Sequence, residues 1–202
     1  MTSAPPPRRQ PVFNLPPTTK ALVAANLLVF AAMWLMSDAA ADAIIGAFGF
    51  TPDRYMAALS WTAIVAPLTY QFLHAGFAHV GVNMLSLVAF GAGVELRLGR
   101  WRMLVFYLLC GVAGAAVEFL LDPASNETMI GASAAISGLF GAILRFRVFR
   151  GGFWTLVVLW FVMNAVTGIA GVGSEAEPIA WVAHIGGFVA GLVLFPIFAR
   201  GR

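Results

Sequence analysis

This chain is poor in the residues that soluble proteins carry on their surfaces. Of its 202 residues 10% are charged, against about 25% in ordinary soluble domains, and Lys20 is its one lysine. The single cysteine, Cys110, permits neither an intrachain disulfide nor a thiolate metal cluster. The basic residues stand in short groups between apolar runs, without the dense cluster typical of nucleic-acid binding. These shortages exclude a disulfide framework and argue against a soluble domain or a nucleic-acid partner.

Apolar residues are what the chain has in excess. They make up 60% of it, and the mean hydropathy of +0.87 places it among membrane proteins. A span needs about 20 apolar residues, and runs of this kind recur along the sequence. We therefore expect an all-α polytopic membrane protein, a six-transmembrane-helix bundle with a long interfacial loop at 38–75. The expected spans are 20–37, 76–95, 101–121, 131–149, 152–171 and 179–199.

The ends and loops of these runs predict the domain organisation and the orientation. Residues 1–18 are rich in proline and poor in apolar surface, which predicts a flexible tail before a membrane domain at 19–202. With the tail inside, Arg54 would be the one basic residue on the outer side, so both termini are predicted to be cytoplasmic. A signal peptide remains the alternative for the first run, because Ala39, Ala40 and Ala41 follow it.

A hydroxyl and two imidazoles stand near the expected outer ends of three spans. Ionisable groups in a span are costly and usually mark function, so Ser133, His79 and His184 are candidates for hydrolytic chemistry. Small residues recur every fourth position after both Ser133 and His184, however, and this spacing also favours simple helix packing. A lone membrane histidine can equally be a hydrogen-bonded packing residue. The residues alone leave both interpretations open.

A second polar pair is expected on one face of the second span. His79 and Asn83 are four residues apart, so their side chains project from the same side of a helix. Two donors aimed at one spot suit an oxyanion, although a pair of interhelical hydrogen bonds would need the same spacing. His74, five residues upstream, is expected at the interface and outside the chemistry.

The motifs together resemble the signatures of the rhomboid family. They run from Phe72 to Met84 (FLHAGFAHVGVNM), from Gly131 to Ala134 (GASA) and from Ala183 to Gly187 (AHIGG). Glu95-Leu96-Arg97-Leu98-Gly99 is similar to a further family element that braces the cytoplasmic end. The resemblance implies a rhomboid-like six-helix membrane domain, an integral protein of a bacterial inner membrane.

The resemblance also implies the activity and its residues. Ser133 would be the nucleophile and His184 the general base and then acid, while His79, Asn83 and the Ser133 backbone N–H would stabilise the oxyanion. The expected protein is an intramembrane serine endopeptidase that needs no cofactor and no metal. Its partners would be transmembrane protein substrates and membrane lipid, with no nucleic acid.

Two positions depart from the family pattern. Ala134 follows the serine where the family usually has glycine, and Ser137 stands where an aromatic ring often stacks on the histidine. The alternatives are therefore an inactive rhomboid-like protein that binds membrane helices and a small transporter with Asn164 on its pathway. Glu118, expected near the outer end of the third span, has no assigned role.

Overall fold

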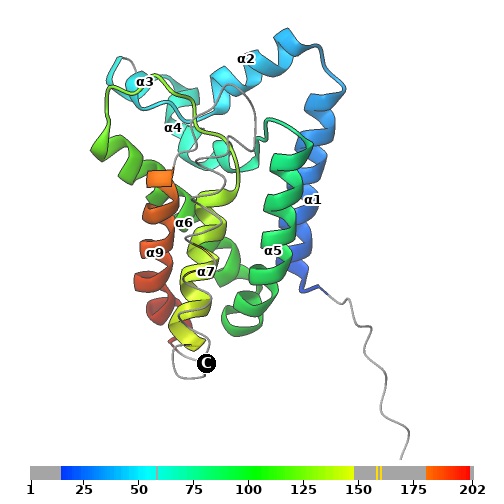
Figure 1. Ribbon diagram of the computed structural model, residues 1–202, viewed down its shortest axis with the longest axis vertical. Coiled ribbons are helices and arrows are strands. Elements are labelled where there is room, and N and C mark those ends of the chain that lie inside the picture. The colour runs from blue at the N-terminus through cyan, green and yellow to red at the C-terminus, as the bar shows by residue number, and fades with distance from the viewer. Residues whose placement is uncertain (1–14, 58, 148–157, 159, 161–180, 201–202) are drawn as a thin grey trace, which may run out of the picture.

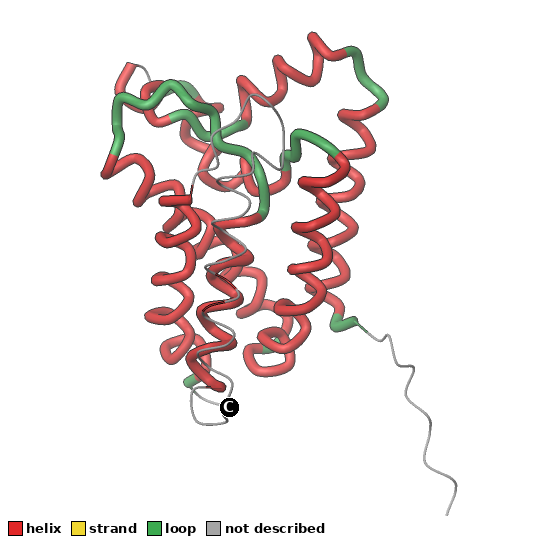
Figure 2. The backbone as a smooth tube through the Cα atoms, viewed as in Figure 1, coloured by secondary structure: helices red, strands yellow, loops and turns green. Residues whose placement is uncertain are grey.

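The computed structural model describes residues 15–57, 59–147, 158, 160 and 181–200. Within these ranges the backbone consists of helices, loops and one isolated β-bridge, as Figure 2 shows. The helices are α1 (Pro17–Trp34), α2 (Asp38–Phe48), α3 (Pro52–Ala57), α4 (Trp61–Thr69), the 3-10 turn η1 (Tyr70–Phe72), α5 (Phe77–Leu98), α6 (Arg100–Leu121), α7 (Ser133–Arg147) and α9 (Trp181–Ala199).

Four described helices are long and apolar enough to cross a bilayer, and they confirm a polytopic membrane protein. They are α1, α5, α6 and α9, which are 18, 22, 22 and 19 residues long. The fourth predicted span, 131–149, is a shorter apolar helix: α7 has 15 residues and is about 22 Å long. It begins only at Ser133 because Gly131 breaks the helix with a φ of 115°. The fifth predicted span, 152–171, lies outside the described residues except for Val158 and Trp160.

The connection between the first two spans folds without becoming a span itself. It forms α2, α3, α4 and η1, which gather at one end of the bundle in Figure 1. Ser37 and Ser60 cap α2 and α4 by accepting hydrogen bonds from backbone N–H groups. No residue of α2 is buried, whereas η1 reaches the interior, where Tyr70 is 1% exposed. The expected position of the 38–75 connection at the membrane interface remains a prediction.

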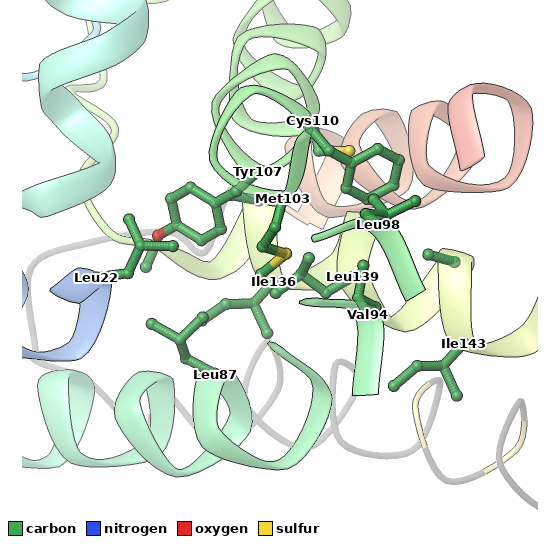
Figure 3. Close-up of a cluster of buried hydrophobic side chains, with 14 of the residues drawn as sticks. Leu22, Leu87, Val94, Leu98, Met103, Tyr107, Cys110, Ile136, Leu139 and Ile143 are labelled. Carbon is green, nitrogen blue, oxygen red and sulfur yellow. The ribbon is translucent and has the colours of Figure 1, made fainter. Parts of the chain in front are cut away.

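The core lies between α5, α6 and α7, with α1 at its edge. Figure 3 shows the side chains that meet there, Leu22, Leu87, Val94, Leu98, Met103, Tyr107, Cys110, Ile136, Leu139 and Ile143. Cys110 is fully buried, so it is a packing residue. Large apolar side chains on the outside, such as Leu28, Leu85 and Leu120, are exposed, as expected where a helix faces lipid.

Small residues bring α7 and α9 into close contact along their length (Figure 1). A Cβ at Gly187 would overlap the carbonyl group of Ala134, and one at Gly191 would overlap that of Gly138. Contacts this tight between backbones need glycine on one side. The packing interpretation of the small-residue spacing is therefore confirmed. The same contact fixes the distance between the helices that carry Ser133 and His184.

The buried carboxylate of Glu95 joins the end of α5 to the start of α1. Glu95 is 3% exposed and accepts hydrogen bonds from Thr18 N (2.8 Å), Thr19 N (2.6 Å) and Thr19 Oγ1 (2.8 Å). It thus satisfies the first backbone N–H groups of α1, which have no acceptor within their own helix. The Thr18 hydroxyl donates in turn to the Arg100 carbonyl at the start of α6 (3.0 Å).

The end of α9 lies at the same end of the bundle. Arg102 Nη1 donates to the carbonyl oxygens of Phe198 (3.1 Å) and Arg200 (3.0 Å), the last described turn of the chain. The starts of α1 and α6 and the ends of α5 and α9 are therefore together, as Figure 1 shows. We call this the basic end, because Lys20, Arg97, Arg100, Arg102 and Arg200 lie there. The starts of α5, α7 and α9 lie at the other end.

Candidate active site

Ser133 is the first residue of α7, and the turn before it is held from two sides. Gly131 N donates to the Tyr70 carbonyl (2.9 Å), which ties the turn to η1. A short antiparallel bridge between Phe50 and Met129, with hydrogen bonds of 3.0 and 2.8 Å, ties the same loop to the connection between α1 and α5. No local sequence pattern predicts this bridge. Its effect is to fix the position from which α7 starts.

The start of α7 lies well inside the bundle. Gly114 of α6 packs so closely on Ala134 that a Cβ at Gly114 would lie 2.7 Å from the Ala134 Cβ. Gly114 comes seven residues before Leu121, where α6 ends, so Ser133 is about 10 Å below that end. Ala134 itself is helical, and a helical alanine is unstrained. The departure from glycine at this position therefore carries no backbone penalty.

Ser133 and His184 face each other across the α7–α9 contact. His184 belongs to α9, and its Nε2 lies 2.7 Å from Ser133 Oγ. For the serine to donate in this hydrogen bond, the imidazole must be neutral with its proton on Nδ1. Both side chains are half-buried. The arrangement is a hydroxyl paired with a base that can take its proton.

His79 lies beside this pair, with a donor directed toward it. Ala75 N donates to His79 Nδ1 at 3.5 Å, a long hydrogen bond that leaves the proton of the neutral ring on Nε2. A Cβ at Gly131 would lie 2.6 Å from His79 Nε2 and 3.8 Å from Ser133 Oγ. The His79 ring thus packs directly on Gly131, close to the Ser133 hydroxyl. Glycine is needed there because a side chain would overlap the His79 ring, and also because of the positive φ.

The backbone at the start of α7 adds a further donor. The first four N–H groups of a helix have no acceptor within it, and Ser133 is the first residue of α7. The same end of the helix carries a partial positive charge. Together with the His79 N–H, this makes the surroundings of Ser133 favourable for a negatively charged oxygen.

Asn83 lies one turn further along α5 and is turned toward its own helix. Its side chain is buried, and Nδ2 donates to the His79 carbonyl at 3.0 Å. The amide therefore has one N–H left to offer. The predicted shared face of His79 and Asn83 is confirmed, since both belong to α5. Among the described residues no hydrogen bond joins Asn83 to Ser133.

His74 is buried within the protein, and its expected position at the membrane interface stays a prediction. It is 3% exposed, and its ring meets that of His79 edge-to-face at 5.0 Å between centroids. Burial and the neighbouring His79 lower the pKa of His74 to about 3, although the Phe72 backbone lies close enough to oppose the shift. Among the described residues, neither ring nitrogen makes a well-formed hydrogen bond. His74 is thus a neutral ring that packs against the ring of His79.

Among the described residues, no group of three or more His, Cys, Asp or Glu side chains is arranged to hold a metal ion.

Comparison with known proteins gives one consistent family. Residues 60–201 match the Rhomboid domain. The rhomboid protease GluP of Bacillus subtilis (strain 168) is 28% identical over 181 residues, which cover 87% of this chain and 34% of that protein. RHOMBOID-like protein 5 of Arabidopsis thaliana is 32% identical over 133 residues, 61% of this chain and 40% of that protein. RHOMBOID-like protein 7 of the same plant is 32% identical over 155 residues, 69% of this chain and 46% of that protein. The chain thus spans less than half the length of these three relatives.

Proposed function

Because this chain belongs to the rhomboid family, we propose that it is an intramembrane serine endopeptidase that cleaves transmembrane protein substrates. The observation that carries the proposal is the 2.7 Å separation of Ser133 Oγ and His184 Nε2, inside a bundle of apolar helices. A serine hydroxyl is a weak nucleophile until an adjacent base takes its proton. The dyad supplies that base at the required distance.

In the first half of the proposed reaction, the Ser133 oxygen attacks the carbonyl carbon of the scissile peptide bond. His184 Nε2 takes the hydroxyl proton as the new C–O bond forms. The carbonyl oxygen becomes an oxyanion, and the His79 Nε2–H and the Ser133 N–H donate to it. The imidazolium then gives its proton to the leaving amine nitrogen, the C–N bond breaks, and an acyl-enzyme remains on Ser133.

In the second half, water repeats the same steps. His184 takes a proton from the water as its oxygen attacks the acyl carbon, and the second oxyanion uses the same donors. Collapse of this intermediate breaks the bond to Ser133 and returns the proton from His184 to the serine oxygen. The free N–H of Asn83 is assigned to the oxyanion as a third, weaker donor. Substrate and water are thereby converted to an amine and a carboxylate, and the enzyme is regenerated.

The proposed topology places the dyad toward the outer face of a bacterial inner membrane. The described lysine and most described arginines lie at the basic end, whereas Arg54 lies at the other. Positive residues favour the cytoplasmic side. We therefore assign the basic end and both termini to the cytoplasm, with six spans in the membrane domain at 19–202 and a flexible tail at 1–18.

The test is cleavage of a fluorescent transmembrane reporter in lipid vesicles. Wild-type protein should cleave it, and Ser133→Ala and His184→Ala should each reduce the rate by about 10⁴-fold or more. Ser137→Ala is the matched control, because it removes a hydroxyl one turn from Ser133 and should leave cleavage intact. Cleavage that survives Ser133→Ala would exclude the mechanism. A folded wild-type protein that binds the reporter without cutting it would indicate the inactive helix-binding alternative.

A further inference from the structure

The junction of α1, α5 and α6 at the basic end contains one described carboxylate, and its oxygens are already engaged. Glu95 accepts hydrogen bonds from the N–H groups of Thr18 and Thr19 and from the Thr19 hydroxyl. Among the described acids it is the one at this end of the bundle, and it is buried. The described part of the junction therefore has no exposed negative charge.

Two exposed cations flank this junction. Lys20 follows Thr19 in the first turn of α1, and Arg100 is the first residue of α6. The hydrogen bond from the Thr18 hydroxyl to the Arg100 carbonyl, 3.0 Å long, holds the two helix starts together. Both side chains are exposed, and no described acid forms an ion pair with either. Two uncompensated positive charges thus stand on adjoining turns of α1 and α6.

Two further arginines at this end differ from Lys20 and Arg100, because their guanidinium groups have partners within the protein. Arg102 Nη1 donates to the last carbonyl groups of α9, as described above. The Arg97 guanidinium lies 4.3 Å from the centre of the Phe146 ring in α7, a cation–π contact. Orientation in the membrane requires positive charge at this end but not this division of roles. Lys20 and Arg100 are therefore the cations available to a ligand at the junction.

The surface next to these cations is apolar and aromatic. Trp101 follows Arg100 and is 68% exposed, and the Arg100 guanidinium lies 4.9 Å from the centre of its ring. Leu96, in the last turn of α5, is 75% exposed. Tryptophan is enriched at the level of lipid headgroups, and long basic side chains extend from an apolar stem toward that level. A ligand that matches this surface needs an anionic head and an apolar tail.

We propose that Lys20, Arg100 and Trp101 form a binding site for the headgroup of an anionic phospholipid. The lipid phosphate accepts hydrogen bonds from the Lys20 ammonium and the Arg100 guanidinium, and so bridges α1 and α6. Its acyl chains lie along the exposed apolar side chains, of which Leu96 is one. A soluble anion would leave this apolar surface uncovered. The site lies at the opposite end of the bundle from Ser133 and does not depend on the proposed protease activity.

Binding of phosphatidylglycerol to the full-length protein in neutral detergent micelles tests the site. Native mass spectrometry separates the protein with and without bound lipid and gives a dissociation constant for each lipid. Two basic residues at a membrane surface strengthen the binding of an anionic lipid by about fivefold each. The wild type should therefore bind phosphatidylglycerol at least about tenfold more tightly than phosphatidylcholine, which has no net charge. Equal affinities for the two lipids would overturn the proposal.

Substitutions locate the binding on the surface. Lys20→Gln and Arg100→Gln should each weaken phosphatidylglycerol binding by about fivefold and leave phosphatidylcholine binding unchanged. Arg145→Gln is the matched control, because Arg145 is an exposed arginine of α7 at the same end, next to Phe146. It removes the same charge away from the α1–α6 junction and should change the affinity by less than about twofold. If all three substitutions weaken binding equally, the attraction is spread over the whole basic end and the defined site is overturned.

Thermal unfolding in nanodiscs gives an independent measurement. A lipid that binds only the folded protein raises Tm. The wild type and Arg145→Gln should have a higher Tm in discs that contain phosphatidylglycerol than in discs of phosphatidylcholine alone, and Lys20→Gln/Arg100→Gln should lose this difference. A double variant that keeps the full difference would overturn the bridge between α1 and α6. Should the double variant fail to fold, Lys20→Gln alone should lose about half of the difference, and an unchanged difference would overturn the site.

Discussion

The two ends of the helical bundle use buried polar groups in opposite ways. At the basic end Glu95 accepts three hydrogen bonds of 2.6 to 2.8 Å from α1. At the other end Ser133 and His184 are half-buried, and buried atoms of His74 and Glu118 make no hydrogen bond among the described residues. A fully bonded buried polar group rigidifies a protein, whereas a buried polar group left without a partner is costly and is not kept for stability. We infer that the basic end holds the fold and the other end is built for chemistry.

The largest expected effect comes from a methyl group at the α7–α9 contact. Gly187→Ala places a Cβ on the Ala134 carbonyl, so the helices must separate. We expect the free energy of unfolding to fall by about 3 kcal/mol and labelling of Ser133 by fluorophosphonate to disappear. Gly93→Ala is the matched control, since a Cβ there meets nothing within 4 Å. It should raise stability by up to about 1 kcal/mol. Equal effects of the two substitutions would contradict the tight packing inferred for the α7–α9 contact at Gly187.

The next effect concerns the donor beside the dyad. His79→Ala should lower kcat for the transmembrane reporter by about 10²- to 10³-fold, because the oxyanion loses a donor that is already in place. Stability should change much less than kcat. Asn83→Ala should have a smaller effect on kcat, since one of its N–H groups is engaged by the His79 carbonyl. Steady-state kinetics of both variants measure this. If kcat fell less in His79→Ala than in Asn83→Ala, Asn83 and not His79 would be the stronger donor to the oxyanion.

At the basic end the expected effect is on stability alone. Glu95→Ala leaves the first N–H groups of α1 without an acceptor and should lower the free energy of unfolding by about 3 kcal/mol. Glu127→Ala, at an exposed acid, should cost almost nothing. Denaturation in mixed micelles measures both. The labelling rate of Ser133 per folded molecule should remain that of the wild type. A tenfold fall in this rate would show that the two ends are not separate in function.

The smallest expected effect is a pH dependence of the free energy of unfolding that comes from His74. His74 stays neutral in the folded protein down to a pKa of about 3, whereas an unfolded histidine binds a proton below about pH 6.5. Unfolding therefore takes up a proton, and stability falls as the pH drops below about 6.5, by up to about 1.4 kcal/mol per pH unit. Above that pH His74 contributes no slope. His74→Leu should flatten the change in unfolding free energy between pH 7 and pH 5.5. Identical slopes would mean that His74 is accessible and charged.

Much of the architecture could be predicted from local apolar runs. The first, second, third and sixth predicted spans correspond to α1, α5, α6 and α9, because a span is recognised by length and hydropathy alone. The fourth is shorter than predicted, since the positive φ of Gly131 delays the start of α7 and hydropathy does not report backbone conformation. The bridge between Phe50 and Met129 pairs two loops far apart in the sequence, and no local pattern encodes such pairing.

Some features of the candidate site could likewise be predicted from the sequence, and others could not. The spacing of His79 and Asn83 fixed their common face, and the small residues around Ser133 and His184 indicated close packing. The direction of the Asn83 amide depends on rotamer choice in the packed state. The burial of His74 and the neighbours of Glu118 depend on how η1 and α9 dock against the bundle. Long-range docking of this kind is set by the whole fold, so the sequence left these residues at the interface or without a role.

The most direct test of the central claim is the mapped reaction of the protein with a fluorophosphonate. If Ser133 Oγ is activated by His184 at 2.7 Å, mass spectrometry should find one adduct, on the peptide that contains Ser133. His184→Ala should abolish the adduct, while Ser137→Ala should retain it. An unlabelled wild type in its folded state, or an adduct that persists at Ser133 in His184→Ala, would contradict the account.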